Sequence, residues 1–493
     1  MIEEEGVRRG RLEALRKEGI DPYPAVIERS HEARAFNAQF RDFLQSKLVV
    51  TVVGRILAIR KHGGMTFVVL EDGTDRLQVA LKRDDIGESA YAHFHDHFDN
   101  GDFLQAQGVA YLTKTEEPTV LASSVRMLTK SLLPLPEKWH GLTDVETRYR
   151  QRELDLLANK DVRQRFIVRS KLISSLRQYL DERGFLEVET PILQPIPGGA
   201  NARPFSTHHN ALNADLYLRI APELYLKRLI VGGFEKVYEI GRLFRNEGID
   251  QSHNPEFTTI ELYWAFVNKE EFVQELEGIM THIVRASLGD LRVEHQGTTI
   301  DFSGSWPRMT FRDAVLGSCG IDINELKTPE AVEKASKQAG LNIDFSRCVG
   351  VGEFYDELFK KTARTAIEQP TWIFDYPIEL KPLARQNPND PTKSASVQLI
   401  VKGQEIINAY YHELNDPIEQ RRRLEEQQAL REQGSHVAQF MDEEFLQALS
   451  HGMPPTSGMG IGIDRLVAFL TNSPNLKEII LFPTLRPESP PSV

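Results

Sequence analysis

The sequence predicts an α+β protein of at least two domains, a small N-terminal β-barrel and a larger region of helices and strands. Three observations lead to this expectation. The chain has 493 residues, too many for one hydrophobic core, and 41% of them are apolar. Short β-rich runs follow Leu48, whereas longer helical patterns and strands follow residue 140. The proline-containing stretch LLPLPEKWHGL places the boundary near residue 140, giving domains 1–140 and 141–493.

Charge and composition exclude several classes of protein. A net charge of −12 argues against indiscriminate binding to polyanions but permits a local basic surface. The acidic excess lies mostly after residue 140, so the N-terminal part is the less repulsive surface for a nucleic acid. No long apolar run is present and the N-terminus is charged, so we expect a cytoplasmic protein with no membrane partner. Two cysteines, Cys319 and Cys348, are too few for a disulfide framework and lack metal-site spacing.

The N-terminal domain is predicted to begin with two helices and to continue as five strands. A turn at Asp21-Pro22-Tyr23-Pro24 separates the helices, the second of which starts at about Ser30. VVTVVGRILAIR, MTFVVLEDGTDRLQVAL, GDFLQAQGVAYL and TVLASSVRML then have strand composition, and Asp72-Gly73 marks a hairpin turn inside the second run. With a helical stretch near residues 90–98, this order is typical of an OB-type barrel, a common platform for nucleic acids.

The larger region contains a long helix, several strands and an insertion. Residues 161–183 carry the apolar stripe of a helix that ends at Gly184, and FLEVETPIL is predicted to follow as a strand. KVYEIGRLFRNEGIDQSHNPEFTTIELYWAF is predicted to form two strands joined by a polar loop. Residues 305–370 have weak periodicity and are interpreted as a mainly helical insertion.

The second of these two strands carries a candidate site. Period-two alternation puts one set of side chains on one face: Phe257, Thr259, Glu261 and Tyr263. A carboxylate on a central strand is unfavourable unless a cation meets it, so Glu261 is interpreted as the ligand of a bound ammonium. By itself the strand fits equally well a sheet with one face in water. The loop favours a site, because Arg245, Glu247 and His253-Asn254-Pro255 suit a phosphate held by a bidentate guanidinium.

A glycine-rich strand, GMGIGIDRLVAFLT, points to a second part of the site. Gly458, Gly460 and Gly462 alternate with apolar residues, so one strand face has no side chains and leaves room for a flat or bulky ligand. We expect Asp464 to cap the next helix and Arg465 to add a guanidinium to an end that already favours anions. Close helix packing is the alternative reason for such glycines.

These segments resemble the three signature motifs of class II aminoacyl-tRNA synthetases. FRNEG…HNPEF is similar to motif 2, GMGIGIDR to motif 3, and the helix with GFLEVETPIL to motif 1, whose Pro191 would lie at a dimer interface. HGLTDVETRYRQRELDL, PIPGGANARPFSTHHNALNADLYLRIAPELYLKRL and ELNDP resemble the lysyl-tRNA synthetases in particular. The similarity runs from about residue 10 to 488, which makes it far more specific than a lone motif. It implies an antiparallel catalytic sheet flanked by helices and an anticodon-binding barrel.

The resemblance also implies an activity. A family member activates L-lysine with ATP and transfers it to the 3′ end of tRNA(Lys), uses Mg²⁺, forms a homodimer and has no DNA partner. The lysine carboxylate attacks the α-phosphorus, so catalysis consists chiefly of positioning and charge stabilisation. Two alternatives are a paralogue that aminoacylates a protein, against which the barrel argues, and a non-catalytic RNA-binding relative. Intact Arg245, Phe257, Glu405 and Arg465 argue against the second.

The implied residue roles fall into four groups. Catalysis and ATP binding are implied for Arg245 at the α-phosphate, Arg465 at the γ-phosphate, Phe257 against adenine, and Glu247, His253, Asn254 and Glu405. Lysine binding is implied for Gly199 and Glu223 at the α-amino group, Glu261 and Tyr263 at the side chain, and Asn408 and Glu413. Metal binding is implied for Glu405 and Gln398, and anticodon binding for Arg60, Phe67 and Gln78. Without the resemblance, Phe67 would be interpreted as a core aromatic.

The chain departs from the family pattern in two places. Gln398 stands seven residues before Glu405, where a metal-binding glutamate is usual, and this predicts weaker binding of one magnesium ion. His412 stands four residues after Asn408, where a lysine-binding glutamate is usual, and Glu413 follows one residue later. We expect a β-bulge around Tyr410-Tyr411 that returns Glu413 to the pocket; on a regular strand His412 would face the substrate instead.

Overall fold

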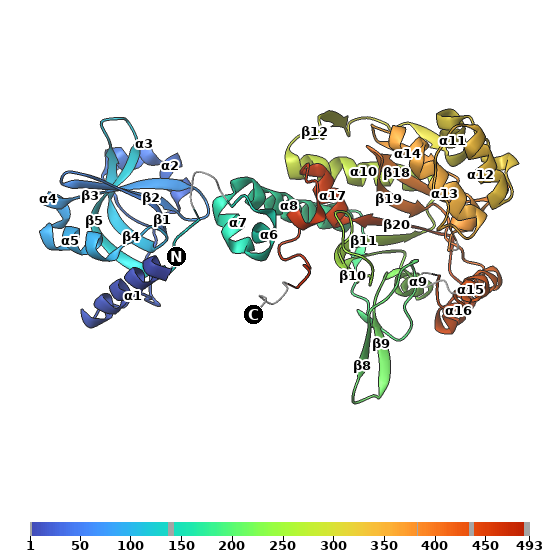
Figure 1. Cartoon of the computed structure of the whole chain (residues 1–493), viewed down its shortest axis with the longest axis horizontal. Helices are drawn as coiled ribbons and strands as arrows, with labels where there is room; N and C mark the ends of the chain where they lie inside the picture. The colour runs from blue at the N-terminus through green and yellow to red at the C-terminus, as the bar shows by residue number, and fades with distance from the viewer. Residues whose placement is uncertain (1, 137–141, 382, 433–437, 488–493) are drawn as a thin grey trace. The chain divides into compact units, whose positions relative to one another are not determined.

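The computed structural model describes residues 2–136, 142–381, 383–432 and 438–487. The chain divides into two compact units, Met1–Leu142 and Thr143–Val493 (Figure 1). Residues 137–141 of the predicted linker lie outside the described residues. No helix in the described ranges is long and apolar enough to cross a membrane.

The first unit is a closed five-stranded barrel with helices around it. Its strands are β1 (Val49–His62), β2 (Met65–Glu71), β3 (Arg76–Lys82), β4 (Phe103–Leu112) and β5 (Pro118–Thr129), in the order β1-β2-β3-β5-β4. Its helices are α1 (Ile2–Lys17), α2 (Ala33–Ala38), α3 (Phe40–Ser46), α4 (Arg83–Ile86) and α5 (Glu88–His97). The predicted OB-type barrel is therefore confirmed, and the expected second helix is divided in two at Gln39.

The turn between β2 and β3 follows from its sequence. Gly73 has a φ of +91°, which suits glycine. The Oδ1 of Asp72 accepts hydrogen bonds from the amide and hydroxyl of Thr74, at 2.9 and 2.6 Å. A side chain that bonds to the backbone two residues on stabilises the hairpin, as the Asp72-Gly73 pair predicted.

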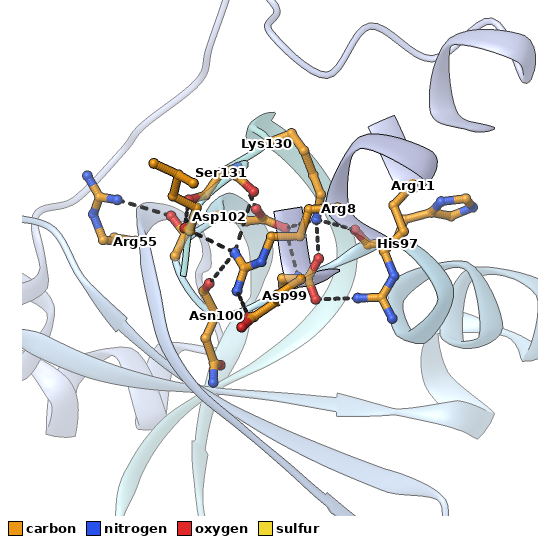
Figure 2. A network of polar contacts seen from close by, with 12 residues as sticks. Arg8, Arg11, Arg55, His97, Asp99, Asn100, Asp102, Lys130 and Ser131 are labelled. Carbon is orange, nitrogen blue, oxygen red and sulfur yellow. Dashed lines mark hydrogen bonds and ion pairs between the residues drawn. The ribbon is translucent and has the colours of Figure 1, made fainter. Parts of the chain in front are cut away.

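A buried ammonium, Lys130, lies at the end of β5 (Figure 2). Its Nζ is 2.8 Å from Asp102 Oδ2 and 2.5 Å from Asp99 Oδ2, and the side chains of Lys130 and Asp102 are fully buried. From α1, Arg11 also pairs with Asp99, and Arg8 donates to the carbonyl oxygen of Asn100 at 3.0 Å. Lys130 and two arginines therefore hold the segment between α5 and β4 against both β5 and α1.

The second unit is built on a mixed eight-stranded sheet in the order β14-β15-β18-β19-β20-β11-β10-β6. These strands are β6 (Leu186–Glu187), β10 (Lys236–Phe244), β11 (Glu256–Ala265), β14 (Arg308–Thr310), β15 (Thr371–Phe374), β18 (Ser396–Val401), β19 (Gln404–Tyr410) and β20 (Thr456–Gly462). Neighbours are antiparallel apart from the two edge pairs β14–β15 and β10–β6. The expected largely antiparallel sheet is confirmed, with parallel pairs only at its edges.

Helices and smaller sheets surround this sheet. The helices are α6 (Val145–Arg150), α7 (Arg152–Ala158), α8 (Lys160–Asp181), α9 (Glu223–Val231), α10 (Lys269–Leu288), α11 (Phe311–Cys319), α12 (Pro329–Gln338), α13 (Val351–Lys361), α14 (Ala363–Ala366), α15 (Pro417–Glu432), α16 (Glu443–Ser450) and α17 (Ile463–Leu470), with 3₁₀ turns η1 (Ile323–Glu325), η2 (Ile378–Leu380) and η3 (Leu476–Glu478). The remaining strands are β7 (Leu193–Gln194), β8 (Ser206–His209), β9 (Ala214–Leu218), β12 (Arg292–His295), β13 (Thr298–Asp301), β16 (Gln386–Asn387) and β17 (Asp390–Ser394). Figure 1 shows the β8–β9 hairpin extending away from the sheet.

One face of the sheet is the main core of this unit. Its members include Ile260 and Leu262 of β11, Met459 and Ile461 of β20, and apolar residues of α8, α10 and α17. Because this face is covered by helices, polar side chains on the same strands must point to the opposite face. Helices α11 to α13 share a separate hydrophobic cluster with Ile373 of β15. These helices lie within the region interpreted as an insertion.

The predicted strand FLEVETPIL is wrong as a continuous element. Only the two-residue strands β6 and β7 form, at its two ends. Pro191 lacks an amide hydrogen, which disfavours pairing with a neighbouring strand. The amide of Thr190 instead donates to Glu239 Oε2 at 3.2 Å, and its hydroxyl does so at 2.7 Å. The chain is held here by a buried carboxylate rather than by a strand partner.

We expect Lys130→Met to lower the free energy of local unfolding of β4 and β5 by about 3–5 kcal/mol, because two aspartates lose their buried cation. Hydrogen–deuterium exchange of the full-length protein would measure this strand by strand. Lys82→Met is the control: its ammonium pairs with Asp85 at the surface and its loss should leave exchange nearly unchanged. Equal exchange in wild type and Lys130→Met would contradict the expectation.

Candidate active site

A cavity of about 460 Å³ lies in the second unit, on the face of the sheet opposite the main core. Strands β11, β19 and β20, the loop after β10 and the start of α9 all contribute to its lining. It gathers residues that are up to 277 positions apart in the chain, from Gly199 to Leu476. The sequence-predicted nucleotide and lysine residues all lie in this lining, whereas Gln398 does not.

Strand β11 alternates as its sequence predicts. Phe257, Thr259, Glu261 and Tyr263 line the cavity, while Ile260 and Leu262 are buried in the core. The strand pairs with β10 on one side and β20 on the other, so it is central in the sheet. Glu261 therefore stands on a central strand, where burial, and secondarily the charge of Glu223, raises its pKa to about 8.

A lysine that the sequence analysis did not single out, Lys227, lies between two of the predicted carboxylates. Its Nζ is 2.6 Å from Glu223 Oε1 and 2.8 Å from Glu413 Oε2, and its side chain is fully buried. Burial lowers the pKa of Lys227, but the two carboxylates outweigh burial and raise it overall. The i,i+4 spacing of Glu223 and Lys227 on α9 was a signal for the first ion pair; nothing local pointed to the second.

Strand β19 has an irregularity that the sequence analysis missed. Leu399 of β18 pairs with Ile407, but the next residue, Ile400, pairs with Glu405. Ile406 is thus an extra residue, and both it and Ile407 are buried in the core. This bulge lets Glu405 and Asn408 face the cavity together, although a three-residue separation places side chains on opposite faces of a regular strand.

The chain gains one further residue after β19. Tyr410 pairs with Gly458, whereas the amide of Glu413 donates to the carbonyl of Thr456 at 2.8 Å. The four residues from Tyr410 to Glu413 therefore lie opposite only the three from Gly458 to Thr456 on β20. This is the extra residue expected near Tyr411. As a result Glu413 lines the cavity, and a pKa above its usual range follows from its burial.

His412 lies outside the cavity lining. Its carbonyl oxygen accepts a hydrogen bond from the amide of Arg385 at 3.1 Å, and its ring lies 5.6 Å from that of Tyr411. Burial, together with the charges of Arg385 and Lys269, lowers the pKa of His412. The imidazole is thus neutral at physiological pH and away from the buried carboxylates.

The glycines of β20 accommodate the protein's own side chains at one position and leave room for a ligand at two others. A Cβ at Gly458 would lie 2.4 Å from Glu413 Oε1 and 2.5 Å from the Tyr263 ring, so the protein's own side chains fill that space. A Cβ at Gly460 would meet Glu261 at an ordinary 3.6 Å, and one at Gly462 would meet Arg465 at 3.8 Å. The bare face expected for a ligand is therefore confined to Gly460 and Gly462.

Two guanidinium groups lie at the other end of the cavity. The Cζ of Arg245 is 5.0 Å from the centre of the Phe257 ring, and burial lowers the pKa of Arg245. Arg465 lies in the first turn of α17. The adjoining loop contributes Glu247, His253 and Asn254; Asn254 is buried, and its Nδ2 donates to the carbonyl of Glu256 at 2.6 Å. Within the described residues Asn254 Oδ1 has no partner, so it can accept from a ligand.

The expected helix cap at Asp464 is wrong. Helix α17 begins after Gly462, and Asp464 lies inside its first turn. Asp464 Oδ2 accepts a hydrogen bond from the amide of Thr258 at 3.0 Å, and Oδ1 lies 2.5 Å from Arg169 Nη1. A nearby guanidinium and a strand amide thus outcompete the helix end for this carboxylate. Asp464 ties α17 and α8 to β11 instead.

The two candidate metal ligands, Glu405 and Gln398, differ in whether their oxygen atoms are free to bind a cation. Glu405 lines the cavity, and no hydrogen bond or ion pair from the described part of the chain engages its carboxylate. An unengaged carboxylate in a cavity suits a divalent cation. Gln398 Oε1 already accepts from the Tyr376 hydroxyl at 2.6 Å, and Gln398 Nε2 donates to Asn408 Oδ1 at 3.0 Å. The structure thus fits a cation at Glu405 better than at Gln398.

Arg60, Phe67 and Gln78 gather on one face of the barrel unit. They line a hollow of about 590 Å³, with His62 and Arg76 beside them. Phe67 is half-buried and does not belong to the barrel core, unlike its neighbour Val68. Gln78 Nε2 donates to Thr119 Oγ1 at 2.9 Å. The interpretation of Phe67 as a core aromatic is therefore wrong.

Comparisons with known proteins agree with these two units. The family model described as tRNA synthetases class II (D, K and N) matches residues 144–486, and that of the OB-fold nucleic acid binding domain of the anticodon type matches residues 50–128. The chain is 47% identical to the lysine–tRNA ligase of Pelotomaculum thermopropionicum, over 98% of this chain and 94% of that protein. It is also 47% identical to the lysine–tRNA ligase of Moorella thermoacetica, over 98% and 97%.

Proposed function

The chain belongs to the lysine–tRNA ligase family of class II tRNA synthetases, and on this basis we propose that it activates L-lysine with ATP and transfers the resulting lysyl group to the 3′ end of tRNA(Lys). Catalysis of both steps would take place in the cavity of the second unit. The relatives' names and the family match support this activity rather than a protein-modifying paralogue or a non-catalytic RNA-binding relative.

The charge of the inner cavity is the observation that best supports lysine as the substrate. Glu223, Glu261 and Glu413 bring three carboxylates, and Lys227 brings one ammonium. The surplus of negative charge suits a ligand with two ammonium groups, as L-lysine has. We propose that Glu223, beside Gly199, meets the α-ammonium, and that Glu261, Tyr263 and Glu413 meet the side chain. An apolar analogue would leave these carboxylates unpaired.

Gly199 supports this placement of the α-amino group. Its φ is +85°, and a Cβ there would lie 2.9 Å from Glu223 Cβ. Only glycine suits such a position, because both the backbone conformation and the space exclude a side chain. The backbone of residue 199 can thus approach the substrate next to Glu223. Asn408, which also lines the cavity, would complete the substrate contacts.

The nucleotide would occupy the outer part of the cavity. Phe257 would stack on adenine, Arg245 would bind the α-phosphate, and Arg465 the γ-phosphate, with Glu247, His253 and Asn254 around them. The lysine carboxylate attacks the α-phosphorus in line, and pyrophosphate leaves. Arg245 and Arg465 stabilise charge on the phosphates as the reaction proceeds, so the protein positions reactants rather than acting as a base.

We propose Mg²⁺ as the divalent metal ion, held by Glu405. A hard cation at this carboxylate would neutralise the phosphate oxygens when ATP is bound. Gln398 would contribute at most a neutral oxygen, because its amide is engaged with Tyr376 and Asn408.

A homodimer is a further part of the proposal. Leu186, Ile192 and Leu193 are exposed to 46%, 45% and 47%, and Pro191 between them is exposed as well. Leu186 lies on the edge strand β6 and Leu193 on the edge strand β7, and exposed apolar side chains of this kind suit a protein–protein interface. Sedimentation equilibrium tests it, since an active monomer would exclude the dimer as a requirement.

Arg245→Ala and Arg465→Ala should each lower lysine-dependent ATP–pyrophosphate exchange by about 10²–10³-fold, because each removes one charge-stabilising contact worth roughly 3–4 kcal/mol. Thermal melting should show an intact fold. Arg312→Ala is the control, since its guanidinium pairs with Asp322 on the surface of the helical region. Near-wild-type exchange in either variant would refute the assignment of the phosphate contacts.

Glu413→Gln should raise the KM for lysine by about tenfold or more, a loss of about 1.4 kcal/mol or more of binding free energy. His412→Ala should leave this KM nearly unchanged, because the imidazole lies outside the cavity lining. Steady-state exchange kinetics at saturating ATP measure both. A larger effect of His412→Ala would mean that the imidazole faces the substrate.

Lysine affinity should rise with pH between about pH 6.5 and 8. The pKa of Glu261 is about 8 in the empty cavity, and a bound ammonium favours the ionised form, so binding below this pH releases a proton. One released proton strengthens binding by up to about tenfold per pH unit. Calorimetry in buffers of different ionisation enthalpy would detect it, and Glu261→Gln should reduce the number of protons released. A constant Kd over this range would contradict the carboxylate's role.

Phe67→Ala should weaken tRNA charging by roughly 1–3 kcal/mol, the usual contribution of one stacked base, while leaving lysine-dependent exchange unchanged. Arg60 and Gln78, which line the same hollow, would bind the anticodon beside it. Charging at subsaturating tRNA and exchange without tRNA measure the two effects separately. If both activities fall together, Phe67 stabilises the fold and does not bind the anticodon.

A further inference from the structure

An ammonium group lies close to Gln398, the position at which the resemblance to lysyl-tRNA synthetases implies a metal-binding glutamate. Lys381, directly after η2, is half-buried and lines the cavity together with Glu405, Arg245 and Arg465. Its Nζ donates a hydrogen bond to Asn408 Oδ1 at 2.8 Å. The same oxygen accepts from Gln398 Nε2 at 3.0 Å. Gln398 and Lys381 are therefore linked through one amide oxygen.

These hydrogen bonds leave little for a metal ion on this side. Asn408 Oδ1 has two lone pairs, and two N–H donors use them. Gln398 Oε1 accepts from the buried hydroxyl of Tyr376. A glutamate at position 398 would attract a divalent cation through its negative charge. The neutral amide of Gln398 offers no such charge. A divalent ion placed here would also face the positive charge of Lys381.

Two tyrosine rings lie near the ammonium group of Lys381, but no carboxylate of the described residues forms an ion pair with it. Its Nζ lies 5.1 Å from the centre of the Tyr376 ring and 5.8 Å from that of Tyr410. No carboxylate in the described ranges lies within ion-pair distance of it, and Glu405 acts on it only at longer range. A partly buried ammonium without an ion pair is unfavourable unless an anion arrives. The anion that this cavity is built to accept is the triphosphate of ATP.

We propose that Lys381 binds the triphosphate of ATP directly and takes the place of one divalent metal ion. This inference rests on the proposed function, since it requires ATP in the cavity. Where a glutamate and a divalent cation together contribute one positive charge, a neutral glutamine and a lysine contribute the same. The protein thus keeps the local charge while using one metal ion fewer. Glu405, which also lines the cavity, remains available for a cation.

The test counts metal ions bound with a non-hydrolysable nucleotide. The full-length protein is titrated with Mn²⁺ in the presence of α,β-methylene-ATP, and free Mn²⁺ is measured by electron paramagnetic resonance. We expect the double variant Lys381→Met with Gln398→Glu to bind one more Mn²⁺ per active site than the wild type. Lys381→Met alone should weaken binding of the nucleotide by about tenfold at low Mn²⁺, and Lys381→Arg should retain most of the affinity.

Two comparisons make the result decisive. Lys334→Met, at an exposed position of α12, controls for loss of a lysine and should change neither the Mn²⁺ count nor the affinity. An equal Mn²⁺ count in wild type and double variant, or an unchanged nucleotide affinity in Lys381→Met, overturns the inference while leaving the proposed function intact. A wild-type protein that binds no α,β-methylene-ATP overturns both.

Discussion

Three carboxylates gathered in one cavity with a single ammonium are the constraint on which the catalytic unit depends. Glu223, Glu261 and Glu413 come from a helix, a central strand and a loop, and Lys227 pairs with only two of them. Buried carboxylates are unfavourable without counter-ions, so the sheet behind them must be held by an extensive apolar core. The raised pKa of Glu261 lets it be neutral in the empty cavity. An incoming ammonium then restores its charge.

Small irregularities in one strand decide which side chains reach the cavity. The extra residue Ile406 turns Glu405 toward the side of Asn408, and the extra residue near Tyr411 brings in Glu413. On a regular strand neither separation, three residues and five, would place both partners on one face. Both ends of the site therefore depend on local departures from strand geometry, whereas its centre, on β11, is regular.

Regular periodicity was predictable from the sequence and long-range pairing was not. The alternation of β11 and the barrel strands follow from local patterns, and the extra residue before Glu413 was visible as a change in motif spacing. Lys227 and Lys381 were missed because a lysine carries no local signal of burial; distant carboxylate and amide groups decide where each lies. Asp464 was misplaced for the same reason, since Arg169 is almost 300 residues earlier in the chain.

The end of β19 is also a place where the chain tolerates a change in length. Residues after His412 are fastened again at once, by the amide of Glu413 on Thr456 and by Asn415 Nδ2 on the carbonyl of Met453 at 3.1 Å. An added residue is absorbed within two positions and does not shift the register of anything that follows. A change of one residue at this point therefore alters which side chain enters the cavity while β20 keeps its pairing with β11.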